Sequence, residues 1–153
     1  MTDSIAQKLN DLGYIQPEPK KHPTVKIVPA RIVGNLVFLS GHGHSEELRG
    51  QVDRDITVEQ GYQAAREVGV NILWSLKNAI GSLDRVEEIV KVLGFVNCAD
   101  GFTRQPEVIN GFTNLMVELF GEERGTHARS AIGASSLPGN LSVEVEMIVR
   151  IKE

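Results

Sequence analysis

The sequence predicts an α+β domain with two helices on one face of a mixed sheet. Two segments, about residues 57–80 and the stretch after Pro106, carry apolar residues at the spacing of an α-helix. Short runs of strand-forming residues lie before, between and after them, and the last run, 141–152, alternates apolar with mostly polar residues. This order of strands, helix, strand, helix and strands is typical of a sheet whose helices pack on one side.

The first 23 residues are expected to form an arm that packs on a main domain of residues 24–153. Its connector, residues 16–23, contains three prolines, which favour an extended chain. A short amphipathic helix precedes the connector and begins at residue 3 or 4. The apolar face of this helix consists of Ile5, Leu9 and Leu12.

Short strands are expected over residues 25–28, 31–33 and 36–40, where β-branched and other apolar residues gather. Gly34 and Asn35 form a turn signal between the second and the third of these strands. Residues 41–50 are polar and rich in glycine, so they predict a loop that follows the third strand.

The first long helix is expected to begin after Thr57, which forms a capping-box pattern with Gln60. It runs to about Ile80 and ends at the turn of residues 81–84. Its apolar face comprises Tyr62, Ala65, Val68, Ile72, Leu76 and Ala79. The second helix has Pro106 in its first turn, where a missing N–H costs nothing. Its apolar stripe comprises Val108, Ile109, Phe112, Leu115, Met116, Leu119 and Phe120.

The strand expected between the two helices, residues 88–98, is apolar on both sides. One side comprises Val90, Val92, Val96 and Cys98, and the other comprises Ile89, Leu93 and Phe95. Residues 36–39 likewise lack a polar face. Two helices cover only one face of such a sheet, and several apolar side chains left in water would cost several kcal/mol. Self-association is therefore expected, and the alternative is that the arm and long loops cover the second face.

A loop is expected over residues 121–126, followed by strands over 127–134 and 141–152.

The composition of the chain excludes several classes of protein. The 153 residues include 20 acidic and 16 basic side chains, which give a net charge of −4. This negative charge disfavours binding to nucleic acid or to an anionic membrane. The longest apolar runs are far shorter than the roughly 20 residues that span a bilayer. The N-terminus lacks a signal core, so we expect a cytoplasmic protein.

The lone cysteine, Cys98, excludes an internal disulfide and is expected to be a small buried residue. The chemistry is expected instead in residues 127–138, where Arg129 begins a strand amid small residues. Such an arginine can keep its guanidinium free for a carboxylate. Fifteen residues later, Glu144 lies on the polar face of the next strand. The alternative is that Arg129 pairs with a glutamate of its own chain.

Four features in this order resemble the YjgF/RidA (reactive intermediate deaminase) family. They are the strand and Ser-Gly segment of residues 34–41, the Asn-Ile-Leu of residues 71–73 with the turn of 81–84, the Arg-Ser pair at 129 and 130 with Leu-Pro at 137 and 138, and the Val-Glu-Val-Glu of 143–146. The resemblance covers residues 25–151. It implies a chorismate-mutase-like fold and a homotrimer with sites in clefts between subunits.

The resemblance also implies a reaction, the hydrolysis of imines or enamines derived from amino acids to 2-oxo acids and ammonia without a cofactor. Arg129 matches the arginine that holds the substrate carboxylate, and Glu144 matches the glutamate that orders the attacking water. Gly41 matches a glycine lining the site. Ser130 and Ala131 follow the arginine and are expected to contact substrate.

Two positions depart from the family pattern, and three histidines need separate consideration. The site tyrosine of the family falls near Ile27, and the cysteine two residues after the arginine is Ala131, where a backbone contact would persist. His42 and His44 directly follow Gly41 and are expected to line the cleft, where one could hydrogen-bond substrate or shuttle a proton. The alternative is a metal site with His127 as third ligand, but His-X-His pairs arise often by chance, so no metal is expected.

Three functions remain open from the sequence. The first is a trimeric imine or enamine deaminase that uses Arg129. The second is a non-catalytic binding or interaction protein that keeps its clefts for small carboxylates or a partner. The third is RNA cleavage, an activity ascribed to some relatives under the name endoribonuclease L-PSP, which the acidic charge disfavours.

Overall fold

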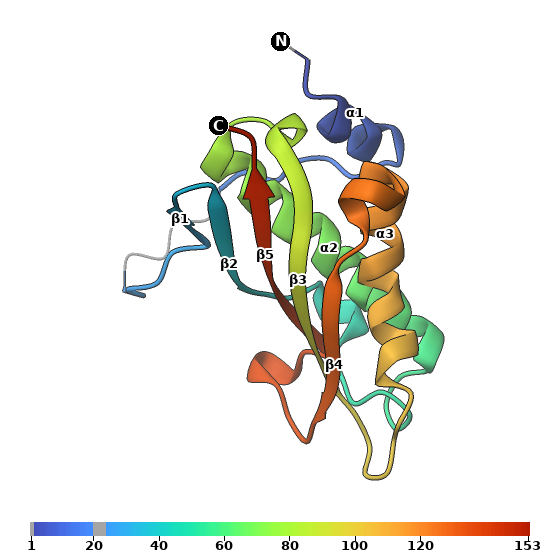
Figure 1. The fold of residues 1–153 in the computed structure, drawn as a ribbon. Helices are drawn as coiled ribbons and strands as arrows, with labels where there is room; N and C mark the ends of the chain where they lie inside the picture. The colour runs from blue at the N-terminus through green and yellow to red at the C-terminus, as the bar shows by residue number, and fades with distance from the viewer. Residues whose placement is uncertain (1, 20–23) are drawn as a thin grey trace.

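The computed structural model, which describes residues 2–19 and 24–153, consists of a five-stranded sheet and a layer of helices (Figure 1). The strands are β1 (Ala30–Val33), β2 (Leu36–His42), β3 (Val86–Asn97), β4 (Ala128–Ala134) and β5 (Val143–Ile151). Their order across the sheet is β1-β2-β5-β3-β4. Only the β3–β4 pair is parallel, so the sheet is mixed as predicted.

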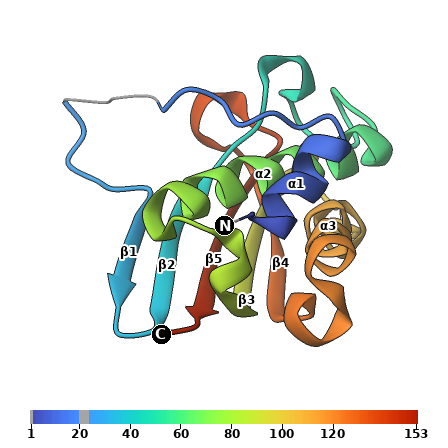
Figure 2. The same cartoon turned by 90° about the horizontal axis from the view of Figure 1, so that it is seen from above.

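Three helices, α1 (Ser4–Asp11), α2 (Val58–Ile80) and α3 (Gln105–Gly125), lie on one face of the sheet (Figure 2). The capping box is confirmed: Thr57 Oγ1 accepts a hydrogen bond from Gln60 N at 3.1 Å, and Gln60 Oε1 accepts one from Thr57 N at 2.9 Å. Every residue of the predicted α3 stripe is buried. The predicted α2 face is buried at Ala65, Val68, Ile72 and Leu76 and half-buried at Tyr62. Ala79 is exposed, because the buried face passes to Ile80 in the last turn.

Three local predictions were wrong. Residues 25–28 form no strand, because they precede β1 and take no part in its ladder with β2. The hydrogen bonds that join this segment and Pro29 to β2 run from Ser40 Oγ to Val28 O and from Ser40 N to Pro29 O. The loop expected from residue 41 begins later, since β2 continues through His42. The loop expected from Gly121 is a break in α3, where that glycine has φ 80° and helical turns resume up to Gly125.

Strand β3 contains an irregularity that changes which side chains face the helices. Its register against β5 shifts between Ile89 and Lys91. Ile89 pairs with Val149 and Val92 pairs with Met147, and these two partners are buried on the same face of β5. In a regular strand, residues three apart would point to opposite faces. Ile89 therefore belongs to the same face as Val92, and the assignment of Ile89 to the opposite side, with Leu93, was wrong.

The N-terminal arm packs on the helical side of the molecule. Ile5 and Leu9 are buried in the core, whereas Leu12 is 43% exposed. Asp3 caps α1 by accepting from Ala6 N at 3.0 Å, and its second oxygen accepts from the backbone N of Leu83, after α2, at 2.7 Å. The alternative in which the arm covers the second face of the sheet is thus wrong for the residues described. Of the expected connector, residues 16–19 have no regular secondary structure and 20–23 lie outside the described residues.

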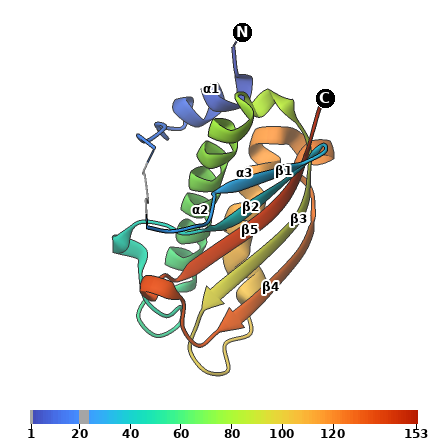
Figure 3. The ribbon, with the colours of Figure 1, turned by 90° about the vertical axis from the view of Figure 1, so that its left-hand side faces the viewer.

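The second face of the sheet carries none of the described helices (Figure 3). Phe38 and Ile132 are 42% and 46% exposed there, on strands whose alternate residues point to this side. Leu93, Phe95 and Ile148 are half-buried on the same face. We refer to this surface as the open face. Separately, none of the helices in the described part of the chain is long and apolar enough to cross a membrane.

Candidate active site

Arg129 lies near the start of β4 and directs its guanidinium toward α3. Its Nη1 donates to Asn110 Oδ1 at 2.8 Å and to Thr113 Oγ1 at 3.1 Å, and both acceptors are uncharged. None of the ion pairs among the described residues includes Arg129, so the alternative of a pair with a glutamate of its own chain does not hold within them. Burial lowers the pKa of Arg129, which nevertheless remains protonated at neutral pH.

Glu144 lies on β5 opposite Phe95 of β3 and against the backbone of β2. A Cβ atom on Gly41 would be 3.0 Å from Glu144 Cδ and 3.1 Å from its Oε2, so the missing side chain makes room for this carboxylate. Burial, and then the negative charge of Glu146, raise the pKa of Glu144 above its ordinary value. A carboxylate with a raised pKa is a stronger base once it is ionised.

Arg129 and Glu144 lie on opposite faces of the sheet within one chain. Val143 and Val145 are buried under the helices, so Glu144 between them points to the open face. Arg129 contacts side chains of α3 and is therefore on the helical face. Strand β3 also separates their two strands. The two residues that the family resemblance assigns to one site do not meet in a single chain.

The residues after Arg129 divide between the two faces. Ser130 Oγ accepts a hydrogen bond from Lys91 Nζ at 3.4 Å on the open face, next to Leu93. Ala131 is half-buried and packs against the core on the helical face. Ser130 is thus on the same face as Glu144, whereas Ala131 is on the same face as Arg129.

His42 and His44 use their ring nitrogens within the chain. His42 contacts Ser40 O at 2.6 Å and Ser75 Oγ of α2 at 2.8 Å, and burial lowers its pKa. His44 contacts Ser45 O at 2.9 Å, and its Nε2 accepts from Ser142 N at 3.1 Å. The His42 ring therefore ties the end of β2 to α2, and the His44 ring ties the segment after β2 to the start of β5.

The alternative of a metal site built from these two histidines and His127 is wrong. His127 precedes β4, which β5 and β3 separate from β2. Its ring contacts Thr113 Oγ1 and Gly125 O, not the other histidines. In the described chain, no group of three or more His, Cys, Asp or Glu side chains is placed to hold a metal ion.

Sequence reasoning missed Asn110 and Thr113, the two acceptors that hold Arg129. They are spaced three apart on α3 and are half-buried beside its apolar stripe. Polar residues at helical spacing beside such a stripe are a signal that the helix faces a polar group there. The sequence does not show that this group is Arg129, because that depends on how α3 crosses β4.

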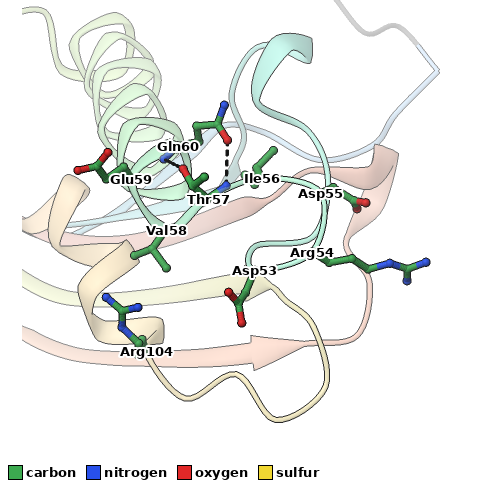
Figure 4. Close-up of a pocket in the computed structure, with 9 residues that line it drawn as sticks. All are labelled: Asp53, Arg54, Asp55, Ile56, Thr57, Val58, Glu59, Gln60 and Arg104. Carbon is green, nitrogen blue, oxygen red and sulfur yellow. Dashed lines mark hydrogen bonds between the residues drawn. The ribbon is translucent and has the colours of Figure 1, made fainter.

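A pocket of about 510 Å³ lies at the start of α2, away from these residues (Figure 4). Its lining comprises Asp53, Arg54, Asp55, Ile56, Thr57, Val58, Glu59, Gln60 and Arg104. The charges in it are mixed, and Arg104 is paired with Glu107 at the start of α3. None of the predicted site residues contributes to this pocket.

The mixed five-stranded sheet with helices on one face is a two-layer α+β domain of the chorismate-mutase-like class, with Arg129 held between β4 and α3. The family model described as "YjgF/chorismate mutase-like, putative endoribonuclease" matches residues 22–150. The chain belongs to this YjgF/chorismate-mutase-like family, which confirms the resemblance deduced from its sequence.

Individual relatives match nearly the whole chain. Protein TCP17 of Trypanosoma cruzi is 40% identical over 151 residues, which are 96% of this chain and 94% of that protein. The crystal structure of Atu1372 of Agrobacterium tumefaciens, of unknown function, has a TM-score of 0.86 at 38% identity and covers 97% of this chain and 92% of that one. A structure from Shewanella oneidensis called a "putative endoribonuclease" has a TM-score of 0.88 at 28% identity, with coverage of 97% and 99%. The similarity therefore extends into the N-terminal arm.

Proposed function

We propose that the protein is an imine or enamine deaminase that converts 2-imino acids to 2-oxo acids and ammonia without a cofactor. The observation that carries this proposal is the Arg129 guanidinium, which two uncharged side chains hold through one nitrogen only. Family membership supports the same reading. A guanidinium held in this way can bind a carboxylate through two parallel hydrogen bonds and so orient the imine carbon beside it.

Glu144 is the proposed base. Water adds through its oxygen to the carbon of the protonated imine, whose nitrogen already carries two hydrogens, while the Glu144 carboxylate takes one proton from the water. The carbon then carries a hydroxyl and an amino group. Glu144 returns its proton to the amino group, which leaves as ammonia, and the hydroxyl loses its proton to solvent as the C=O bond forms. Burial, and then the negative charge of Glu146, raise the pKa of Glu144, which makes the ionised carboxylate a stronger base. Because the base must be ionised to accept the first proton, activity is expected to fall as the pH drops through this raised pKa.

We further propose that each site is shared between two subunits of a homotrimer. Arg129 of one protomer and the partner's Glu144 would form the site, because the two residues face opposite sides of the sheet in one chain. The apolar side chains of the open face support association, since surfaces of this kind are usually buried between chains. Gly41 belongs to the Glu144 half of the site, and Ala131 belongs to the Arg129 half.

Co-expression of two inactive variants tests the shared site. Arg129→Ala and Glu144→Gln are each expected to lose hydrolysis of an imine that an amino-acid oxidase generates in the assay. Co-expressed in equal amounts, they form mixed trimers in which about a quarter of the sites draw an intact Arg129 and an intact Glu144 from different chains. About a quarter of the wild-type activity is therefore expected. Folded mixed trimers without activity would contradict a site shared between subunits.

Replacing Glu146 by glutamine is expected to move the acid limb of the kcat/KM profile to lower pH. The negative charge of Glu146 raises the pKa of Glu144, so removing that charge lowers this pKa and keeps the base ionised in more acidic solution. The profile is measured for wild type, for Glu146→Gln and for Glu123→Gln, a control on the exposed surface of α3. An acid limb at the wild-type pH in Glu146→Gln would show that Glu144 is not the group being titrated.

A binding protein without turnover is the second candidate. It is favoured by Ile27, which is 73% exposed near the place of the family's site tyrosine, and by Ala131 in place of the cysteine. On this reading, 2-oxobutanoate raises the melting temperature of the protein through Arg129, yet no imine is hydrolysed faster than in buffer. The net charge of −4 does not distinguish the deaminase from the binding protein. It disfavours RNA as a ligand in either case.

A further inference from the structure

Four polar side chains from three segments converge beside the start of β4. Asn110 and Thr113 come from α3, Arg129 comes from β4, and His127 comes from the two residues that connect them. The distances are 2.8 Å from Arg129 Nη1 to Asn110 Oδ1, 3.1 Å to Thr113 Oγ1, and 3.0 Å from Thr113 Oγ1 to His127 Nε2. His127 Nδ1 is 2.7 Å from Gly125 O.

The hydrogen bonds of Arg129 have a fixed direction, because a guanidinium only donates. Nη1 carries two hydrogens, and Asn110 Oδ1 and Thr113 Oγ1 accept them. Nη1 is then fully used. Among the described residues, no acceptor lies on Nε or Nη2. The edge of the guanidinium that remains for a ligand is the side edge formed by Nε and Nη2.

The donor and acceptor roles of the two ring nitrogens of His127 are also fixed. Gly125 O can only accept, so His127 Nδ1 carries the hydrogen of the neutral ring and Nε2 is an acceptor. Burial, and also the positive charge of Arg129, lower the pKa of His127 and favour this neutral ring. The Thr113 hydroxyl therefore donates to Nε2. Its lone pairs are left for Arg129.

We propose that His127 is a positioning residue for Arg129, acting through the Thr113 hydroxyl so that the guanidinium offers its Nε and Nη2 edge to a carboxylate. This inference rests on the proposed function, because it concerns the same arginine. Without an acceptor at position 127, the Thr113 hydroxyl rotates and its hydrogen competes with Arg129 for the space between them. The guanidinium then turns, and the carboxylate loses one of its two hydrogen bonds.

Binding of 2-oxobutanoate by calorimetry tests this inference on the full-length protein. His127→Leu and Thr113→Val each remove one link and are expected to weaken binding about tenfold, the scale of one lost hydrogen bond. The double variant is expected to be no weaker than either single one, because both act through the same hydroxyl. Thr113→Ser and His127→Gln keep the hydroxyl and the acceptor, so they are expected to stay within about threefold of wild type.

The controls separate this inference from the function on which it rests. Arg129→Ala is expected to abolish binding of 2-oxobutanoate. Wild-type affinity in this variant would overturn both the proposed function and the role of His127. If Arg129→Ala loses binding while His127→Leu and Thr113→Val bind as wild type, only the role of His127 is overturned. Additive losses of binding free energy in the double variant of His127 and Thr113 would also overturn the role of His127. Thermal melting confirms that each variant is folded, and His127→Ala takes the place of His127→Leu if the latter does not fold.

Discussion

Replacing Gly111 with alanine is expected to lower the free energy of unfolding by about 3 kcal/mol, because α3 lies directly on the backbone of α2 at this residue. A Cβ atom at position 111 would overlap the carbonyl oxygen of Tyr62 and approach Arg66 N to 3.1 Å. A helix backbone cannot rotate out of the way as a side chain can. The two helices must therefore separate, which loosens the core around Phe112.

The matched control is Gly69→Ala, on α2 and facing the same pair of helices. The added Cβ would be 2.9 Å from Leu115 Cδ2 and 3.3 Å from Met116 Cε, which are the mobile ends of side chains. A change of less than about 1 kcal/mol is expected, since alanine also favours the helix. Urea unfolding at one protein concentration gives both values. Equal losses in the two variants would show that the backbone contact does not set the helix spacing.

Leu9→Ala is expected to destabilise the protein by about 2–5 kcal/mol, although Leu9 belongs to an N-terminal arm. Its side chain is 0% exposed and lies in the same core as α2 and α3. Truncation therefore removes apolar contact and leaves a cavity beneath α1. The experiment measures the free energy of unfolding and follows α1 by hydrogen exchange.

Leu12→Ala is the control for Leu9, because it removes the same group at the exposed end of the same helix. A loss below about 1 kcal/mol is expected there. A similar small loss in Leu9→Ala would mean that α1 detaches at little cost and is an appendage. The hydrogen bonds from Ser4 to the Asp84 carboxylate, at 2.8 and 2.6 Å, argue for a firm attachment.

The parts of the fold that depend on neighbours in sequence were predictable. The capping box of Thr57 and the buried stripe of α3 are local patterns, and both were confirmed. The break at Gly121 was misjudged as the end of α3, because glycine both ends helices and interrupts them. A sequence does not show whether helical hydrogen bonds resume after such a residue.

Features set by contacts between strands were not predictable. The register shift near Lys91 is fixed by how β3 pairs with β5, so the alternation of β3 could not reveal it. For the candidate site, Arg129 and Glu144 came from the residue pattern and the family resemblance. Their opposite orientations came only from the structure, since the face of each residue depends on the register of three strands.

If the site is shared between chains as proposed, the separation of Arg129 from Glu144 makes the activity depend on the protein concentration. A folded single chain would contain both groups and yet no complete site, so activity per chain would fall on dilution below the dissociation constant of the assembly. Cells that make little of the protein would then lose its activity more steeply than its amount.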